Sequence, residues 1–216
     1  MSPRTLSLLA ASCGVLLSAG AQAFTIDYLT LANSNERGYS AYTTSNGGVT
    51  VTATGTSIGD TNSTPDYYAY LDSGNAGLGV CKTVTSGMQC SPSSDDNVTF
   101  GEALNLTFSQ AVTLDQLRFR NADHGTTFAS NADISISIDG GVFTDFSLVH
   151  LFNTPLTGTS FTFIGDSTHD GDQFYISSVG GSVYTPPPST GVPIPGSLWL
   201  LTGSLVALRR RFVPQA

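Results

Sequence analysis

The sequence predicts an all-β body, a two-sheet antiparallel sandwich of the jelly-roll-like or immunoglobulin-like kind, flanked by an N-terminal signal helix and a C-terminal apolar helix. Three observations support this fold class. Apolar and polar residues alternate with a period of two in many short segments. No stretch of the body has apolar residues at helical spacing over three turns. Fourteen of the 16 acidic residues are Asp, which suits turns, and only two are Glu, which suits helices.

The alternation assigns one apolar face to each strand. Leu104, Leu106 and Phe108 point to one side of the chain, and the residues between them are polar. Strands of this kind pack as two sheets, face to face. The Asp-Gly-Gly segment 139–141 lies between two such strands and predicts a hairpin turn. The expected strands are 49–54, 67–71, 104–108, 112–120, 134–138, 142–149, 161–164 and 174–179.

The N-terminal segment 1–23 has the three parts of a secretory signal peptide. Arg4 precedes an apolar run, and Ala21 and Ala23 then form a small-x-small cleavage site. We therefore expect cleavage between Ala23 and Phe24, and export across the inner membrane.

The C-terminal segment 192–216 also has three parts: a Val-Pro-x-Pro box, an apolar stretch and a cluster of arginines. The stretch 192–208 is uncharged over 17 residues, which is at the short end of what spans a bilayer as a helix. The arginines should stay on the cytoplasmic side of the membrane. The residues that define the segment are Val192, Pro193, Pro195, Trp199, Gly203, Arg209, Arg210 and Arg211.

This segment resembles the PEP-CTERM sorting signal of exported bacterial surface proteins. The resemblance implies an exosortase-type sorting enzyme as a partner, and it implies a link to exopolysaccharide. Ile194 stands where the commonest box has Glu, as in the variant with an apolar residue at that position. The body segment from Gly77-Leu-Gly-Val-Cys81 to Gly101-Glu102 also resembles a segment of such exported proteins. This second resemblance implies no activity. A permanent membrane anchor is the alternative to processing.

These segments divide the chain into a signal peptide at 1–23, a β-sandwich body at 24–184, a proline-rich spacer at 185–191 and a sorting tail at 192–216. Residues 24–191 contain four of the eight basic residues and all 16 acidic residues, a net charge of −12. A nucleic-acid-binding domain needs a basic face, so we do not expect nucleic acid as a partner.

Cys81 and Cys90 are the two cysteines that are left when the signal peptide is removed. In an exported protein, this pair predicts one disulfide that closes the loop 82–89. A zinc site with His124 or His150 is the alternative, but no CxxC or HxxxH spacing supports it.

An acidic loop and a neighbouring turn supply five oxygen-bearing side chains. Calcium takes six to eight oxygen ligands, often from one such loop together with carbonyl groups. The sequence therefore predicts a calcium site, with a solvated acidic turn as the alternative. Two further acidic segments, 60–66 and 166–172, are weaker candidates. The five predicted ligands are Asp95, Asp96, Asn97, Glu102 and Asp123.

The sequence contains no evident catalytic constellation. It has no nucleophile elbow, zinc-protease motif or P-loop. Glu102 with Asp95 or Asp123 is a candidate acid–base pair of a glycosidase, but acids occur throughout the body. The tyrosine cluster at 67–70 is a candidate surface for sugar stacking, with core packing as the alternative.

We therefore predict a non-enzymatic protein of the cell surface or extracellular matrix that associates with exopolysaccharide, with or without calcium. It is exported, and its C-terminal helix lies in the membrane before processing. The alternatives are a secreted carbohydrate-active hydrolase and a self-assembling structural matrix protein without glycan affinity.

Overall fold

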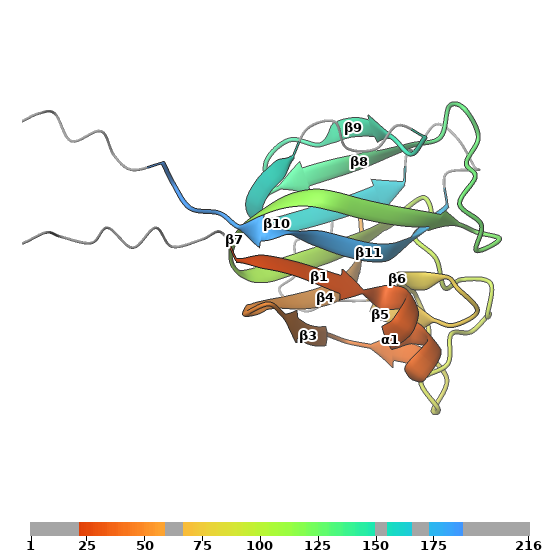
Figure 1. Ribbon diagram of the computed structural model, residues 1–216. Coiled ribbons are helices and arrows are strands. Elements are labelled where there is room, and N and C mark those ends of the chain that lie inside the picture. The colour runs from red at the N-terminus through yellow and green to blue at the C-terminus, as the bar shows by residue number, and fades with distance from the viewer. Residues whose placement is uncertain (1–21, 59–66, 150–154, 166–172, 188–216) are drawn as a thin grey trace, which may run out of the picture. The chain divides into compact units, whose positions relative to one another are not determined.

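The computed structural model describes residues 22–58, 67–149, 155–165 and 173–187. These residues form mostly antiparallel β-sheet with one short helix, so the predicted all-β class is confirmed (Figure 1). The elements are β1 (Ala23–Asp27), α1 (Tyr28–Ser34), β2 (Arg37–Tyr39), β3 (Tyr42–Asn46), β4 (Val49–Ser57), β5 (Tyr68–Asp72), β6 (Gly77–Cys81), β7 (Glu102–Asn121), β8 (Asp133–Ile138), β9 (Thr144–Ser147), β10 (Leu156–Gly165) and β11 (Phe174–Val183).

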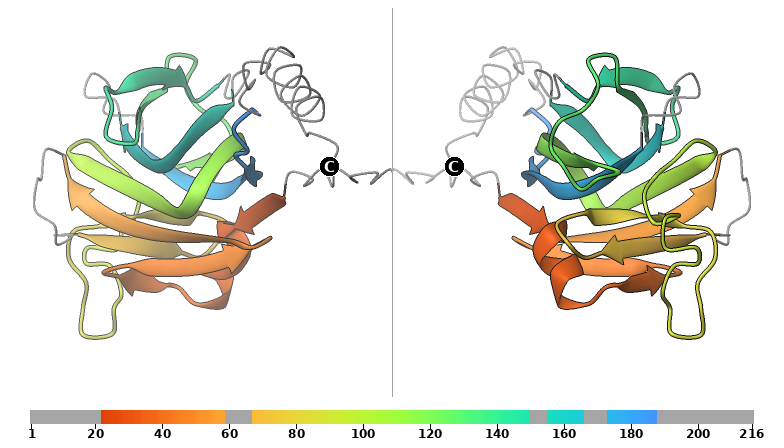
Figure 2. Two further views of the ribbon diagram at one scale, coloured as in Figure 1. Left: turned by 90° about the vertical axis from the view of Figure 1, so that its left-hand side faces the viewer. Right: turned by 90° about the vertical axis from the view of Figure 1, so that its right-hand side faces the viewer.

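The strands form a continuous hydrogen-bonded network in the order β2-β5-β6-β11-β7-β10-β8-β9. β1 pairs with β11, β4 pairs with β7, and β3 pairs with β4. In both views of Figure 2, the red-to-yellow strands of the N-terminal half lie below the green-to-blue strands of the C-terminal half. The chain therefore covers its apolar side chains by folding one half over the other.

β7 is the strand that joins the two halves. Its first part, up to Phe108, pairs with β4, and its second part, from Val112, pairs with β11. β10 follows the opposite edge of β7, with a bulge between Gly158 and Ser160. Because β7 changes its partner on one edge near its middle, it pairs with strands of both halves.

The sequence predicts two strands, 104–108 and 112–120, where the structure has the single 20-residue β7. The polar residues at 109–110 interrupt the alternation, but they do not interrupt the extended backbone. The backbone N–H of Thr50 donates to Ser109 Oγ over 3.1 Å, and that of Tyr184 donates to the carbonyl of Ala111 over 2.9 Å. Neighbouring strands thus hold the junction extended.

One apolar core lies between the halves. Leu104 and Leu106 are fully buried, as the alternation predicts. The ring of Phe108 lies between those of Phe24 and Phe161, with centroids 5.8 and 5.7 Å away. Edge-to-face and tilted aromatic pairs at this spacing add to the burial of apolar area.

The hairpin of β8 and β9 follows the predicted turn but differs in its extent. Asp139 and Gly140 have φ values of 51° and 72°, as a tight two-residue hairpin turn requires. β9 is shorter than the predicted 142–149, and Val142 is 89% exposed. The polar face of β8 is also buried. Its Ser135 hydroxyl has a hydrogen-bond partner there, because it donates to Asp145 Oδ1 over 2.5 Å.

The alternation pattern of the sequence does not predict β1, α1, β2, β3 or β6. α1 has only seven residues, too few for three turns of helical spacing, and Asp27 caps it by accepting the Thr30 N–H over 3.2 Å. All five residues of β6 are buried, so this strand has no alternation to detect. Two glycines allow its close packing, since a β-carbon at Gly79 would collide with the carbonyl oxygen of Asp96.

The two ends of the body lie side by side. Ala23 is opposite Ser182, and the Val183 N–H donates to the carbonyl of Gln22 over 2.9 Å. By its internal contacts, the chain divides into two units after Tyr184. In the described part of the chain, no helix is long and apolar enough to cross a membrane. The predicted signal helix, Ala21 and the sorting segment 192–216 lie outside the described residues.

We expect Phe24→Ala to lower the free energy of unfolding by about 3–5 kcal/mol, because it removes a buried ring from the core. Phe24 is 3% exposed, although the predicted cleavage makes it the first residue of the exported chain. Thr25→Ala is the matched control on the exposed face of β1, with an expected change within about 0.5 kcal/mol. Urea unfolding measures both; equal losses in the two variants would contradict this account of β1.

Candidate functional site

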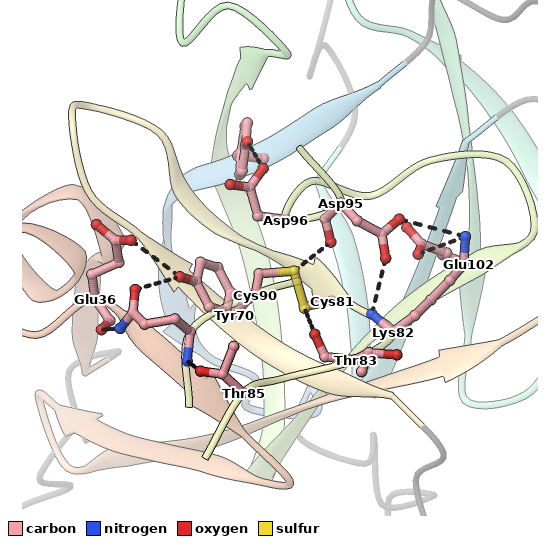
Figure 3. The surroundings of a disulfide bond; sticks show 12 residues. Glu36, Tyr70, Cys81, Lys82, Thr83, Thr85, Cys90, Asp95, Asp96 and Glu102 are labelled. Atoms are coloured by element: carbon pink, nitrogen blue, oxygen red, sulfur yellow. Dashed lines mark hydrogen bonds and ion pairs between the residues drawn. A yellow bond between two sulfur atoms is a disulfide. The ribbon is translucent and has the colours of Figure 1, made fainter. Parts of the chain in front are cut away.

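A disulfide joins Cys81, at the end of β6, to Cys90, with the two Cα atoms 5.8 Å apart (Figure 3). This is the pairing that the sequence analysis expects, and it leaves neither sulfur free to bind zinc. Both cysteines pack against Tyr70 in a small cluster separate from the main core. The Tyr70 hydroxyl lies 3.1 Å from Glu36 Oε1. The disulfide thus closes the loop 82–89 and fixes its base.

Lys82 neutralises two of the predicted calcium ligands. Its Nζ lies 3.6 Å from Asp95 Oδ1 and 3.5 Å from Glu102 Oε1 (Figure 3). Glu102 is fully buried and also accepts the backbone N–H of Thr99 over 2.9 Å. Burial raises the pKa of Glu102 to about 7, although the Thr99 N–H and the Lys82 ammonium act in the opposite direction. The ion pair therefore joins a buried carboxyl group to a partly exposed ammonium group.

The other predicted ligands point elsewhere. The Tyr175 hydroxyl donates to Asp96 Oδ1 over 2.5 Å, and the Asn97 amide donates to Gln173 over 3.0 Å. Asp123 is exposed on the turn after β7. Among the described residues, no group of three or more His, Cys, Asp or Glu side chains is arranged to hold a metal ion. Calcium at this loop stays a prediction that only a binding measurement tests.

A polar pocket of about 430 Å³ lies on the Asp96 side of the loop. Asp72 is 7% exposed, and its Oδ2 lies 3.1 Å from Nε2 of His124. The other ring nitrogen of His124 is 3.0 Å from the carbonyl of Gly74. Burial, and next the charge of Asp96, raise the pKa of Asp72 to about 6. The pocket thus brings together Asp72 of β5 with Glu36, Asp96 and His124, which lie in three separate loops.

The sequence does not predict Asp72 or Tyr175 as site residues. Each lies in a strand, and only the pairing of β5, β6 and β11 brings them together with Asp96 and His124. No local pattern marks such a long-range cluster.

The remaining predicted residues have structural roles or lie outside the described part. Tyr70 is 1% exposed and belongs to the disulfide cluster, whereas Tyr67 and Tyr68 are half-buried. Because Glu102 is fully buried, its carboxyl group does not face solvent as a glycosidase acid or base would. His150 and the acidic segments 60–66 and 166–172 lie largely or wholly outside the described residues.

A groove of about 470 Å³ lies against β1, β7 and β11. Asp27 is opposite Ser178, which is opposite Arg118. Directly opposite residues of antiparallel strands share one face of the sheet, so these three side chains form a row. A bulge between Ile176 and Ser178 interrupts β11 at this point. The polar lining of the groove includes Thr25, Asp27, Arg118, Arg120, Thr126 and Ser178.

An apolar wall completes the groove. Leu29 of α1, Phe128 and Leu148 line it, and Phe128 is half-buried against the main core. Aromatic and aliphatic surface beside hydroxyl, carboxylate and guanidinium groups is the usual composition of a small-ligand site.

Comparisons with protein-family models, curated proteins and solved structures give no significant match to this chain. The fold and the sites define a disulfide-bonded, acidic, antiparallel β-protein with a polar groove on one face of its sheet.

We expect the free energy of unfolding to fall as the pH rises from about 4.5 to about 7. Folding raises the pKa of Glu102 from 4.5 to about 7, so the folded state binds this proton more tightly than the unfolded chain. That contribution is fully present below pH 4.5 and is lost as the pH rises through about 7. The raised pKa of Asp72 acts in the same direction between 3.8 and about 6.

Glu102→Gln should flatten this dependence, and at pH 8 the variant should be as stable as wild type or up to about 2 kcal/mol more stable. The remaining Lys82 side chain is 41% exposed and keeps Asp95 as its partner, so no buried charge is left alone. Urea unfolding between pH 4 and 8 measures the slopes. Asp115→Asn, at an exposed position of β7, is the control that should keep the wild-type slope. An unchanged slope in Glu102→Gln would refute the assignment.

Proposed function

We propose that this chain is a non-enzymatic exported protein of the cell surface or extracellular matrix, and that it associates with exopolysaccharide. The groove against β1, β7 and β11 is the observation that carries the binding. Sugars present hydroxyl groups and apolar C–H faces, and the groove offers hydroxyl, carboxylate and guanidinium groups beside the ring of Phe128.

Export is supported by the buried disulfide, because such bonds persist in oxidising compartments. The signal peptide at 1–23 directs the chain across the inner membrane. The sorting tail holds it there through the apolar helix until an exosortase-type enzyme acts, or permanently if no processing occurs. The signal peptide precedes β1 and the sorting tail follows β11, and these two ends of the body are paired with each other. The row of Asp27, Ser178 and Arg118 lies four residues further along β1, roughly 13 Å from that point.

The two layers are proposed to form a face-to-face sandwich of the jelly-roll-like or immunoglobulin-like kind. The change of partner along β7 and the single core between the layers support this description.

A secreted hydrolase and a self-assembling matrix protein are the competing functions. The burial of Glu102 counts against the predicted glycosidase pair. Self-assembly has some support in the exposed apolar tip of the β8–β9 hairpin, where Val142 and Phe143 are 89% and 46% exposed.

We expect the exported protein, purified from the producing cells, to co-sediment with the exopolysaccharide of those cells in calcium and equally in EDTA. The expectation for EDTA follows from Lys82, which already neutralises Asp95 and Glu102. The melting temperature in the two buffers is measured alongside.

Other results would change the assignment in defined ways. A calcium-dependent rise in melting temperature, with binding lost in EDTA, would restore the calcium site. Release of reducing sugar that Glu102→Gln abolishes would establish a hydrolase. Assembly of the protein without any polysaccharide binding would establish a structural matrix protein.

A further inference from the structure

We propose that the groove against β1, β7 and β11 recognises a carboxylate-bearing sugar, and that Arg118 binds the carboxylate. The inference rests on the proposed association with exopolysaccharide and narrows its ligand to acidic polysaccharide.

The charge distribution favours an anionic ligand at this one place. The body has a net charge of −12 and only four Lys or Arg residues, at 37, 82, 118 and 120. Two of these four, Arg118 and Arg120, line the groove, and among the described residues Asp27 is its single acidic lining residue. The groove is thus locally cationic on a body that otherwise repels anions.

Of the two arginines that line the groove, Arg118 is the one available to a ligand. Arg37 is not a lining residue, and its guanidinium lies over the ring of Tyr39, 5.3 Å from the ring centroid. Lys82 is paired with Asp95 and Glu102, and the guanidinium of Arg120 donates to the carbonyl of His124 over 3.2 Å. Arg118 is exposed, and no carboxylate of the described residues lies within 4 Å of its guanidinium. A guanidinium presents a planar fork of donors that matches a carboxylate in a bidentate pair.

The neighbours of Arg118 suit the rest of a sugar ring. The Ser178 hydroxyl lies on the same face of the sheet, one strand away. Asp27 lies one strand further and is held in place, because its carboxylate accepts the N–H and the hydroxyl of Thr30 over 3.2 and 2.8 Å. Phe128 also lines the groove and supplies an aromatic surface. A carboxylate at Arg118 therefore places ring hydroxyls toward Ser178 and Asp27.

The same guanidinium chemistry would accept a phosphate, so duplex DNA is the competing polyanion. DNA binding needs many phosphate contacts and a basic surface. The groove offers two arginines on a strongly acidic body, and its volume of about 470 Å³ is of a size that holds a small ligand, within the roughly 300–1,000 Å³ of such sites. These features favour a saccharide unit over a duplex.

The test uses tetragalacturonate and its fully methyl-esterified form, in which a methyl group on each carboxyl removes its charge and leaves the rest of the sugar chain unchanged. The full exported chain is titrated with each by calorimetry. We expect the wild type to bind tetragalacturonate about tenfold or more tightly than the ester, the effect of a charged hydrogen-bonded pair. Arg118→Gln should lose that preference, and Arg118→Lys, which keeps the charge without the fork, should retain part of it.

Ser86→Asp is the matched control. It lowers the net charge by the same one unit as Arg118→Gln, at an exposed position of the disulfide loop that does not line the groove. It should leave the affinity for tetragalacturonate within about twofold of wild type, since distant exposed charges are screened by salt. Melting temperatures of all three variants check that the fold is intact.

The outcomes separate this inference from the proposed function. Equal affinity for the two probes, or full affinity in Arg118→Gln, overturns the carboxylate assignment, and the proposed function stands if the cells' exopolysaccharide still binds. Tighter binding of a DNA duplex than of tetragalacturonate also overturns it. Absence of binding to both probes and to the exopolysaccharide overturns both.

Discussion

The pairing of β7 with three other strands is the constraint on which the rest of the structure depends. Its first part carries β4 and its second part carries β11, while β10 follows its other edge. Through β11 it positions β1 and β6, and through β10 it positions β8. Phe108 faces the core from the first part, whereas Arg118 faces the groove from the second. One strand therefore fixes both the core and the binding face.

The acidic side chains of the body are handled in two physical ways. Some are buried beside a cation or a histidine: Glu102 lies near Lys82 and accepts the Thr99 N–H, and Asp72 lies beside His124. Such groups have raised pKa values because burial disfavours their charge. Others lie exposed in loops, where water solvates them. The first arrangement occupies Lys82, one of the four cations of the body, in internal pairing.

The sequence predicts those parts of the structure that repeat locally. The alternation of Leu104, Leu106 and Phe108 reports a half-buried strand, and the cysteine spacing reports a disulfide, because both depend on neighbours along the chain. β6 escapes prediction since it is buried on both faces. The continuity of β7 escapes it because hydrogen bonds from Thr50 and Tyr184, not local polarity, hold its junction. The groove and the acidic pocket are the parts that the sequence predicts least, because pairing between distant strands decides which acid lies beside which cation.

The case for a ligand at Arg118 depends on this contrast between internal and external pairing. A chain with 16 acids has many ways to place a carboxylate beside each of its cations, and it does so for Lys82. Arg118 is instead held in a row with Ser178 and Asp27, two strands away from the nearest acid of that row. Adjacent strands lie about 4.8 Å apart, so Asp27 is too far for an ion pair yet near enough to contact the same sugar. The register of β1, β11 and β7 thus leaves a gap between cation and acid that a small polar ring can fill.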